Sequence, residues 1–136
     1  MQMSPFRWID LFGDGSLRMA MGFEGFVGVA NTSELSISFG LTKGKKMQLK
    51  VLAVGGSPQA TAAADDFLRE IEDGNAAKKT KRWLDQRATD KQTEHLRKQG
   101  IEVGFMDFSW TKYKAACMLS FMWNKVEIER AVEKYL

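Results

Sequence analysis

Apolar and polar residues alternate along the chain between residues 6 and 54. The clearest example is residues 17–23, where the apolar positions are Leu17, Met19, Met21 and Phe23. A period of two is typical of half-buried antiparallel strands. Five such segments are separated by turn residues and cover residues 6–12, 16–23, 26–30, 34–41 and 47–54. The pattern therefore predicts an antiparallel meander of about five strands.

The pattern changes after the last of these segments. Ser57 is a suitable N-cap, Pro58 suits a first helical position and Gly74 suits a helix end, so residues 58–73 are predicted to be a helix. Its apolar stripe is Phe67, Leu68 and Ile71. A sheet with an apolar face must be covered, so we expect this helix to lie across the sheet.

Three further helices are expected in the C-terminal part. The first is Asp90–Gln99, with a T-x-x-Q capping box from Thr89 and a Gly100-Ile101 stop. An extended connection over residues 102–108 follows, anchored by Val103 and Phe105. The second helix, capped by Ser109 or Thr111 and ending near Trp123, has little polar surface and should be central. The last begins at the N-x-x-E of Asn124 and presents an apolar face of Ile128, Ala131, Val132 and Tyr135.

Together these elements predict an α+β fold: an N-terminal antiparallel meander of about five strands covered by one helix, followed by a C-terminal bundle of about three helices. Residues 74–79 are the best candidate boundary, which divides the chain into residues 1–75 and 76–136. The lysines after it are either a solvated linker or the start of a helix that runs to Arg87.

Charge separates the two halves more clearly than the net value of +3 for 136 residues. Residues 78–136 hold thirteen Lys or Arg against eight Asp or Glu, an excess of +5, whereas residues 1–42 hold two against four, or −2. The sequence contains no run of about 18 apolar residues and no secretory-type start, so a cytoplasmic protein that contacts no membrane is expected.

Candidate catalytic chemistry is sparse. Cys117 is the one cysteine and lies in an apolar helix, and His95 is the one histidine, so neither a disulfide nor a zinc site is expected. The glycine-rich segments lack the lysine-serine ending of a phosphate loop. The acidic residues of 65–73 are best explained as a solvated helix face. A protein without enzymatic activity, metal or cofactor is therefore expected.

The segment RATDKQTEHLRKQGIEV, with the later SWTKYKAACMLS, resembles a small helical module found near the ends of helicases and nucleases, including phage-borne ones. The matching positions are Thr89, Lys91, Gln92, Leu96, Arg97, Gly100, Ile101, Thr111 and Lys112. The resemblance covers about a third of the chain and none of the sheet. It implies work beside nucleic acid, without the motor or nuclease chemistry.

A basic surface is the remaining candidate site, because lysine and arginine release counterions from phosphates and aromatic rings stack on unpaired bases. The predicted nucleic-acid-binding residues are Lys78, Lys79, Lys81, Arg82, Trp83, Arg87, Lys91, Arg97, Lys98, Lys112 and Lys114. Trp83 is the expected stacking group. A secondary basic tip is formed by Lys43, Lys45 and Lys46, which could instead protect an edge strand. The simpler alternative is that Trp83 and Trp110 belong to the core and the lysines only improve solubility.

The leading hypothesis is an accessory protein that binds single strands or the phosphate backbone. The alternative is a small protein-binding subunit or inhibitor of a nucleic-acid-processing machine of phage or mobile-element type. It is favoured by methionines that could make adaptable contacts: Met19, Met21, Met106, Met118 and Met122.

Overall fold

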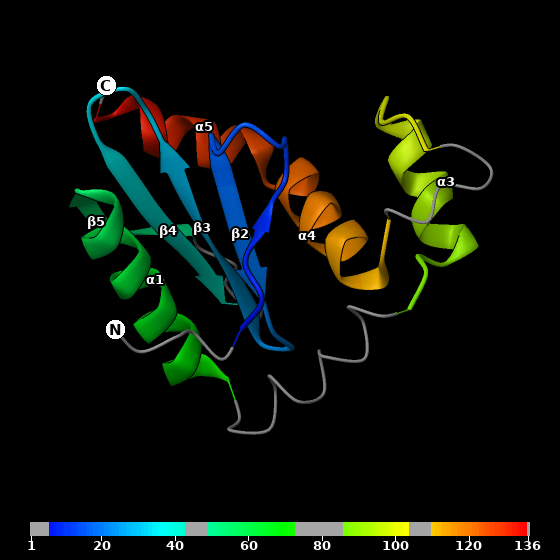
Figure 1. Cartoon of the computed structure of the whole chain (residues 1–136), viewed down its shortest axis with the longest axis horizontal. Helices are drawn as coiled ribbons and strands as arrows, with labels where there is room; N and C mark the ends of the chain where they lie inside the picture. Colours follow the sequence, from blue (N-terminus) through cyan, green and yellow to red (C-terminus); the bar gives the residue numbers. More distant parts are fainter. Residues whose placement is uncertain (1–5, 43–48, 73–85, 104–109, 136) are drawn as a thin grey trace.

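The computed structural model describes residues 6–42, 49–72, 86–103 and 110–135, and these form an α+β fold (Figure 1). The strands are β1 (Ile9–Asp10), β2 (Leu17–Met21), β3 (Gly25–Asn31), β4 (Ser36–Thr42) and β5 (Leu49–Gly55). The helices are α1 (Ser57–Ile71), α3 (Asp90–Lys98), α4 (Lys112–Trp123) and α5 (Lys125–Glu133). The predicted fold class is confirmed. Within these ranges no helix is long and apolar enough to cross a membrane.

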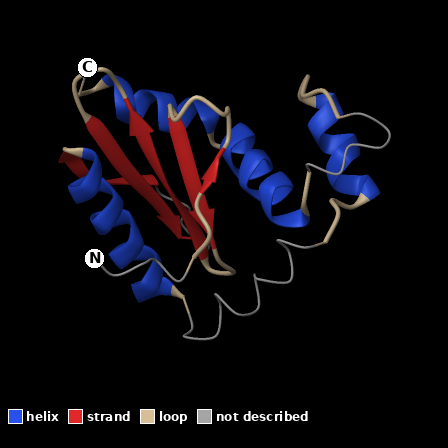
Figure 2. Ribbon diagram, in the orientation of Figure 1, coloured by secondary structure: helices blue, strands red, loops and turns tan. Residues whose placement is uncertain are grey.

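The sheet is the predicted meander. Its strand order is β1-β2-β3-β4-β5 and each neighbouring pair is antiparallel. Met19 lies opposite Gly28, which lies opposite Phe39, so alternate residues of successive strands share a face. Apolar residues occupy both faces, and Figure 2 shows α1 on one side of the sheet with α4 and α5 on the other.

Helix α1 covers one face through small side chains as well as large ones. Ala60, Ala64 and Leu68 are fully buried against a strand surface that includes Val27 and Val29. The predicted stripe of residues 67, 68 and 71 is therefore only part of the contact. The close approach depends on Gly40, because a Cβ there would come within 2.7 Å of the Phe67 ring.

Both ends of α1 differ from the prediction, and tertiary contacts explain why. The N-cap is Gly56, whose N–H donates to the Gln59 side chain at 3.3 Å. The predicted cap, Ser57, instead accepts a hydrogen bond from Arg18 of β2 at 3.2 Å. At the other end Glu72 follows the helix, and its carboxylate accepts from the backbone N–H groups of Phe23 and Glu24 at 3.0 and 2.7 Å. The predicted stop, Gly74, lies outside the described residues.

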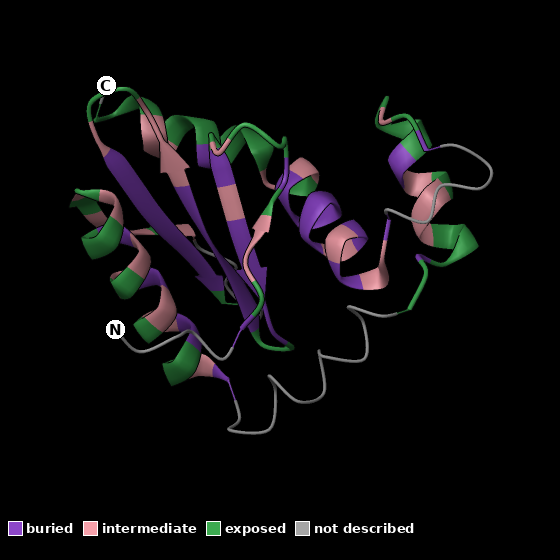
Figure 3. Cartoon of the chain, in the orientation of Figure 1, coloured by how far each residue is buried: buried purple, intermediate pink, exposed green. Residues whose placement is uncertain are grey.

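The opposite face is covered by α4 and α5. Helix α4 has seven buried residues, six of them in the larger core, which confirms that it is central, and Figure 3 shows it buried along much of its length. That core contains Met19, Met21, Phe26, Phe39 and Leu41 from the strands and Tyr113, Cys117, Met118, Phe121 and Ile128 from the helices. Both sides of the predicted boundary near residue 75 thus contribute to one core. The boundary itself lies outside the described residues and stays a prediction.

Helix α3 begins and ends as its sequence predicts. Thr89 and Gln92 form the capping box, with side-chain to backbone distances of 3.1 and 3.0 Å. Gly100, at φ +83°, ends the helix, and the N–H of Ile101 donates to the carbonyl of Leu96 at 3.0 Å. This pattern is a Schellman motif. Leu96 and Val103 are buried in the core that α4 shares, so α3 is anchored to α4.

The caps of the last two helices give one confirmation and one correction. Thr111 caps α4 by accepting from the Lys114 N–H at 3.2 Å. Asn124 does not form the predicted capping box, because its side-chain amide donates backwards to the Ser120 carbonyl at 2.8 Å. Of the predicted apolar face of α5, Ile128 is buried but Tyr135 is 44% exposed. Val103 anchors the connection as expected, whereas Phe105 lies outside the described residues.

Tyr113 joins α4 to the sheet through its buried hydroxyl. The ladder between β1 and β2 ends at Ile9 and Met19, and its register, if continued, would place Trp8 opposite Ala20 and then Arg7 opposite Met21. There the Tyr113 hydroxyl accepts from the Met21 N–H at 2.9 Å and donates to the Arg7 carbonyl at 2.7 Å. Burial raises the pKa of Tyr113 far above its usual value, so the hydroxyl keeps its proton.

Replacing Tyr113 with Phe should lower the free energy of unfolding by about 2 kcal/mol, because the Met21 N–H and the Arg7 carbonyl lose their shared partner. Urea unfolding followed by circular dichroism measures this loss. Tyr135→Phe is the matched control and should leave the midpoint unchanged. An unchanged midpoint in Tyr113→Phe would show that the hydroxyl contributes nothing to the junction.

Candidate nucleic-acid interface

A short antiparallel bridge brings together the starts of α3 and α4, which are 22 residues apart in the sequence (90 and 112). Arg87 and Thr111 form the bridge pair. The Ala88 N–H donates to the Trp110 carbonyl at 3.0 Å, and the Lys112 N–H donates to the Gln86 carbonyl at 2.9 Å. The bridge therefore fixes one end of α3 beside the same end of α4.

Four of the predicted phosphate-binding residues lie within about one helical turn of this bridge. We call them the basic end: Arg87, Lys91, Lys112 and Lys114. Arg87 and Lys91 are exposed, whereas Lys112 and Lys114 are half-buried. The side-chain amide of Gln92 donates to the Lys112 carbonyl at 3.3 Å, which ties the first turn of α3 to that of α4. The geometry thus gathers cations from two separate segments.

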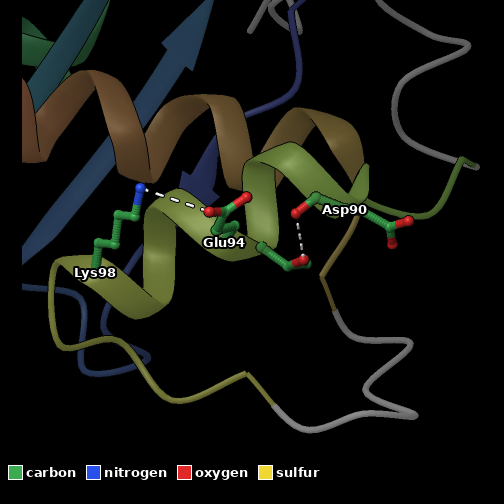
Figure 4. A network of polar contacts seen from close by, with 4 residues as sticks. Asp90, Glu94 and Lys98 are labelled. Atoms are coloured by element: carbon green, nitrogen blue, oxygen red, sulfur yellow. Dashed lines mark hydrogen bonds and ion pairs between the residues drawn. The ribbon is translucent and has the colours of Figure 1, made fainter.

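The other two described cations, Arg97 and Lys98, lie in the last turn of α3. The Arg97 guanidinium donates twice to the Val103 carbonyl, at 3.2 and 3.1 Å, and so closes the segment that follows the helix. Lys98 forms an exposed pair with Glu94 at 3.5 Å on the outer side of α3 (Figure 4). Such exposed pairs contribute little to stability, so the Lys98 ammonium is readily available to another anion.

The remaining predicted positions lie outside the described residues. They are Lys43, Lys45, Lys46, Lys78, Lys79, Lys81, Arg82 and Trp83. Their assignment to the interface stays a prediction.

The aromatic residues are arranged differently from the basic ones. Trp110 is 7% exposed and Tyr113 is 1% exposed, so both belong to the core, as the simpler alternative predicts for Trp110. The Lys114 ammonium lies 4.5 Å from the centre of the Trp110 ring, a cation–π contact that fixes this lysine near the bridge. Neither ring can stack on a base.

Sequence reasoning missed an exposed aromatic residue. Trp123, at the end of α4, is 63% exposed, and its ring lies 6.4 Å from that of His95 with an interplanar angle of 82°. The sequence pattern identifies Trp123 only as the end of an apolar helix. Trp123 lies eleven residues after Lys112, which is close to three helical turns, so the two residues lie on one side of α4. This spacing is the sequence feature that could have identified Trp123 as a candidate interface residue.

Comparison with known families now bears on this arrangement. The profile of the family described as the C-terminal domain of the mitochondrial helicase Irc3 matches residues 1–135. The chain belongs to this family. No curated protein and no solved structure matches it significantly.

Membership of this helicase C-terminal domain family confirms the predicted resemblance to modules near the ends of helicases. It also corrects its extent, because the match includes the sheet and not only a third of the chain. Capping residues and glycine stops, which carried the resemblance, are shared by many helical hairpins. The strands carry no comparable short motif, so their part in the family was not visible.

Cys117 and His95, the one cysteine and the one histidine, lie in different environments. Cys117 is a buried free cysteine, and burial raises the pKa of its thiol, which disfavours the reactive thiolate. His95 packs edge-on against Trp123. Among the described residues no group of three or more His, Cys, Asp or Glu side chains could hold a metal ion.

Native protein should react slowly with an aromatic disulfide reagent at pH 8, and fast with one thiol per chain in urea, because Cys117 reacts only when α4 opens. Absorbance of the released thiolate measures this reaction. The unfolded thiol loses its proton near the usual pKa of 9.0 and the folded one retains it, so the free energy of unfolding should fall as pH rises above about 9. Fast labelling of native protein would contradict the burial of Cys117.

Proposed function

We propose that this chain is a nucleic-acid-binding accessory domain whose basic end contacts the phosphate backbone. The family to which the chain belongs is described as a helicase domain, which supports a role beside nucleic acid. Within that role the domain contributes binding and no catalysis of its own, in agreement with the buried thiol of Cys117. The proposal concerns backbone contact, which positions a protein on nucleic acid without reading its sequence.

The observation that supports this function most directly is the assembly of the basic end. Arg87 pairs with Thr111 across the bridge, Lys112 follows Thr111 in the chain, and Lys91 lies in the first turn of α3. Capping and bridge hydrogen bonds hold these backbones, so little order is lost when the side chains meet phosphates. Both helices also begin here, and the positive ends of their dipoles add to the attraction for anions.

The alternative, a protein-binding subunit or inhibitor, loses part of its support. Its argument relied on adaptable methionine contacts, but Met19, Met21 and Met118 are buried in the main core. Met122 is half-buried, and Met106 lies outside the described residues. Buried methionines fill space between the sheet and α4 and are not available to a partner.

Removing the charges of Lys91 and Lys112 together, by substitution with Ala, should weaken binding to a single strand at low salt. Each lost phosphate contact should also reduce the slope of log affinity against log salt by about 0.7, so the double variant should lose about 1.4. Fluorescence anisotropy of a labelled oligonucleotide at several salt concentrations measures both quantities. Lys50→Ala, an exposed lysine on β5, is the control and should behave as the wild type.

An unchanged slope in the double variant would remove the basic end from the interface. The pair Lys79→Glu and Arg82→Glu then tests the predicted positions outside the described residues in the same assay. If neither pair changes the slope, the proposed mode of binding is wrong.

A further inference from the structure

Trp123 has the largest exposed fraction among the large apolar side chains of the described residues. An indole costs free energy when it faces water, so an exposed tryptophan at the end of a central helix calls for an explanation. The ring is not free to rotate at random, because it meets the His95 ring nearly at a right angle. The contact orients the indole while most of its surface stays open.

Charged side chains of both signs lie on the two helices next to Trp123, α3 and α5. Lys91, His95 and Lys98 are spaced by four and three residues, so they lie on one side of α3. Lys125 opens α5 two residues after Trp123 and is only loosely paired with Glu129, at 4.0 Å. Lys98 is paired with Glu94 on the outer side of α3, so Lys125 is the cation closest to Trp123 in the sequence.

The basic end and Trp123 lie along one line of α4. Lys112 and Trp123 share a side of the helix, and a rise of 1.5 Å per residue separates their backbones by roughly 16 Å. At the rise of about 3.4 Å per nucleotide of a fully stacked strand, that distance corresponds to at most about five nucleotides, and an unstacked strand covers it with fewer. A strand whose phosphates contact the basic end can therefore extend as far as Trp123.

We propose that Trp123, oriented by His95, is the stacking platform for an unpaired nucleobase of a bound single strand. This inference rests on the proposed function and specifies its ligand, because only a strand with unstacked bases offers a free π-face to the indole. The bases of a duplex are stacked on each other and offer none. The basic end would bind both forms, and Trp123 would favour the single strand.

Phe12 provides a matched control for this proposal. It is 50% exposed, and its ring lies 5.6 Å from that of Phe121 at 81°, nearly the geometry of Trp123 on His95. Its neighbours in the sequence are acidic, however, since Asp10 and Asp14 lie two residues away on either side. Removing either aromatic ring deletes a similar exposed contact, but only Trp123 lies on the same helix as Lys112 of the basic end.

The test measures anisotropy of a labelled oligo(dT) of about 16 nucleotides, the upper end of common single-strand site sizes, and of a duplex of equal length. Wild-type protein is compared with Trp123→Ala, Trp123→Phe and Phe12→Ala. Trp123→Ala should bind the single strand about tenfold more weakly at every salt concentration, with an unchanged salt slope and unchanged duplex affinity. Trp123→Phe should recover part of the loss, and Phe12→Ala should match the wild type.

Each other result overturns a specific part of the account. Wild-type affinity in Trp123→Ala would remove the stacking site and leave the basic end in place. An equal loss for single strand and duplex, or an equal loss in Phe12→Ala, would mean that the ring supports the fold and does not stack. If wild-type protein binds neither oligonucleotide at low salt, the proposed function and the stacking site both fail.

Discussion

The hydroxyl of Tyr113 occupies the place where the backbone ladder between the first two strands would continue, and the position of the C-terminal helices depends on it. It bridges Met21 and Arg7 from within α4, so a side chain completes hydrogen bonds that strands normally complete. A buried N–H or carbonyl without a partner is costly. This interaction therefore fixes α4 on the sheet at a defined depth and register, beyond what nonspecific apolar packing requires.

From that junction the structure is built in layers. Helix α1 and helix α4 enclose the sheet from its two faces, and α3 then packs on α4 (Figure 1). Because α4 contacts the sheet on one side and α3 on another, it has little polar surface, as its sequence shows. The candidate interface lies where α3 and α4 begin, so the central helix also positions the basic residues of that end.

Local signals were sufficient for most of the fold. Period-two alternation located the strands, and Thr89, Gly100 and Thr111 marked helix ends because their roles need only neighbouring residues. Predictions failed where a distant partner intervened: Ser57 is engaged by Arg18 from β2, so Gly56 becomes the cap. Asn124 does not cap α5 with its side chain, because its side-chain amide donates a hydrogen bond to the Ser120 carbonyl of the preceding helix.

The interface could be predicted in composition but not in arrangement. Basic residues were evident as a charge excess, whereas the bridge between residues 87 and 111, which gathers four of them, joins segments that no short pattern connects. Burial determines which aromatic rings can contact a ligand. Trp110 is buried, whereas Trp123 is exposed.

The separation of the basic residues from the exposed Trp123 has a physical consequence for nucleic-acid recognition. Charge attracts any nucleic acid and weakens as salt rises, whereas stacking depends on an unpaired base and persists in salt. A domain that carries both at opposite ends of one helix gains its single-strand preference from the aromatic end alone. Raising the salt should therefore reduce the affinity for both forms but increase the preference for the single strand, because each phosphate contact contributes a salt slope of about 0.9 on a duplex and about 0.7 on a single strand.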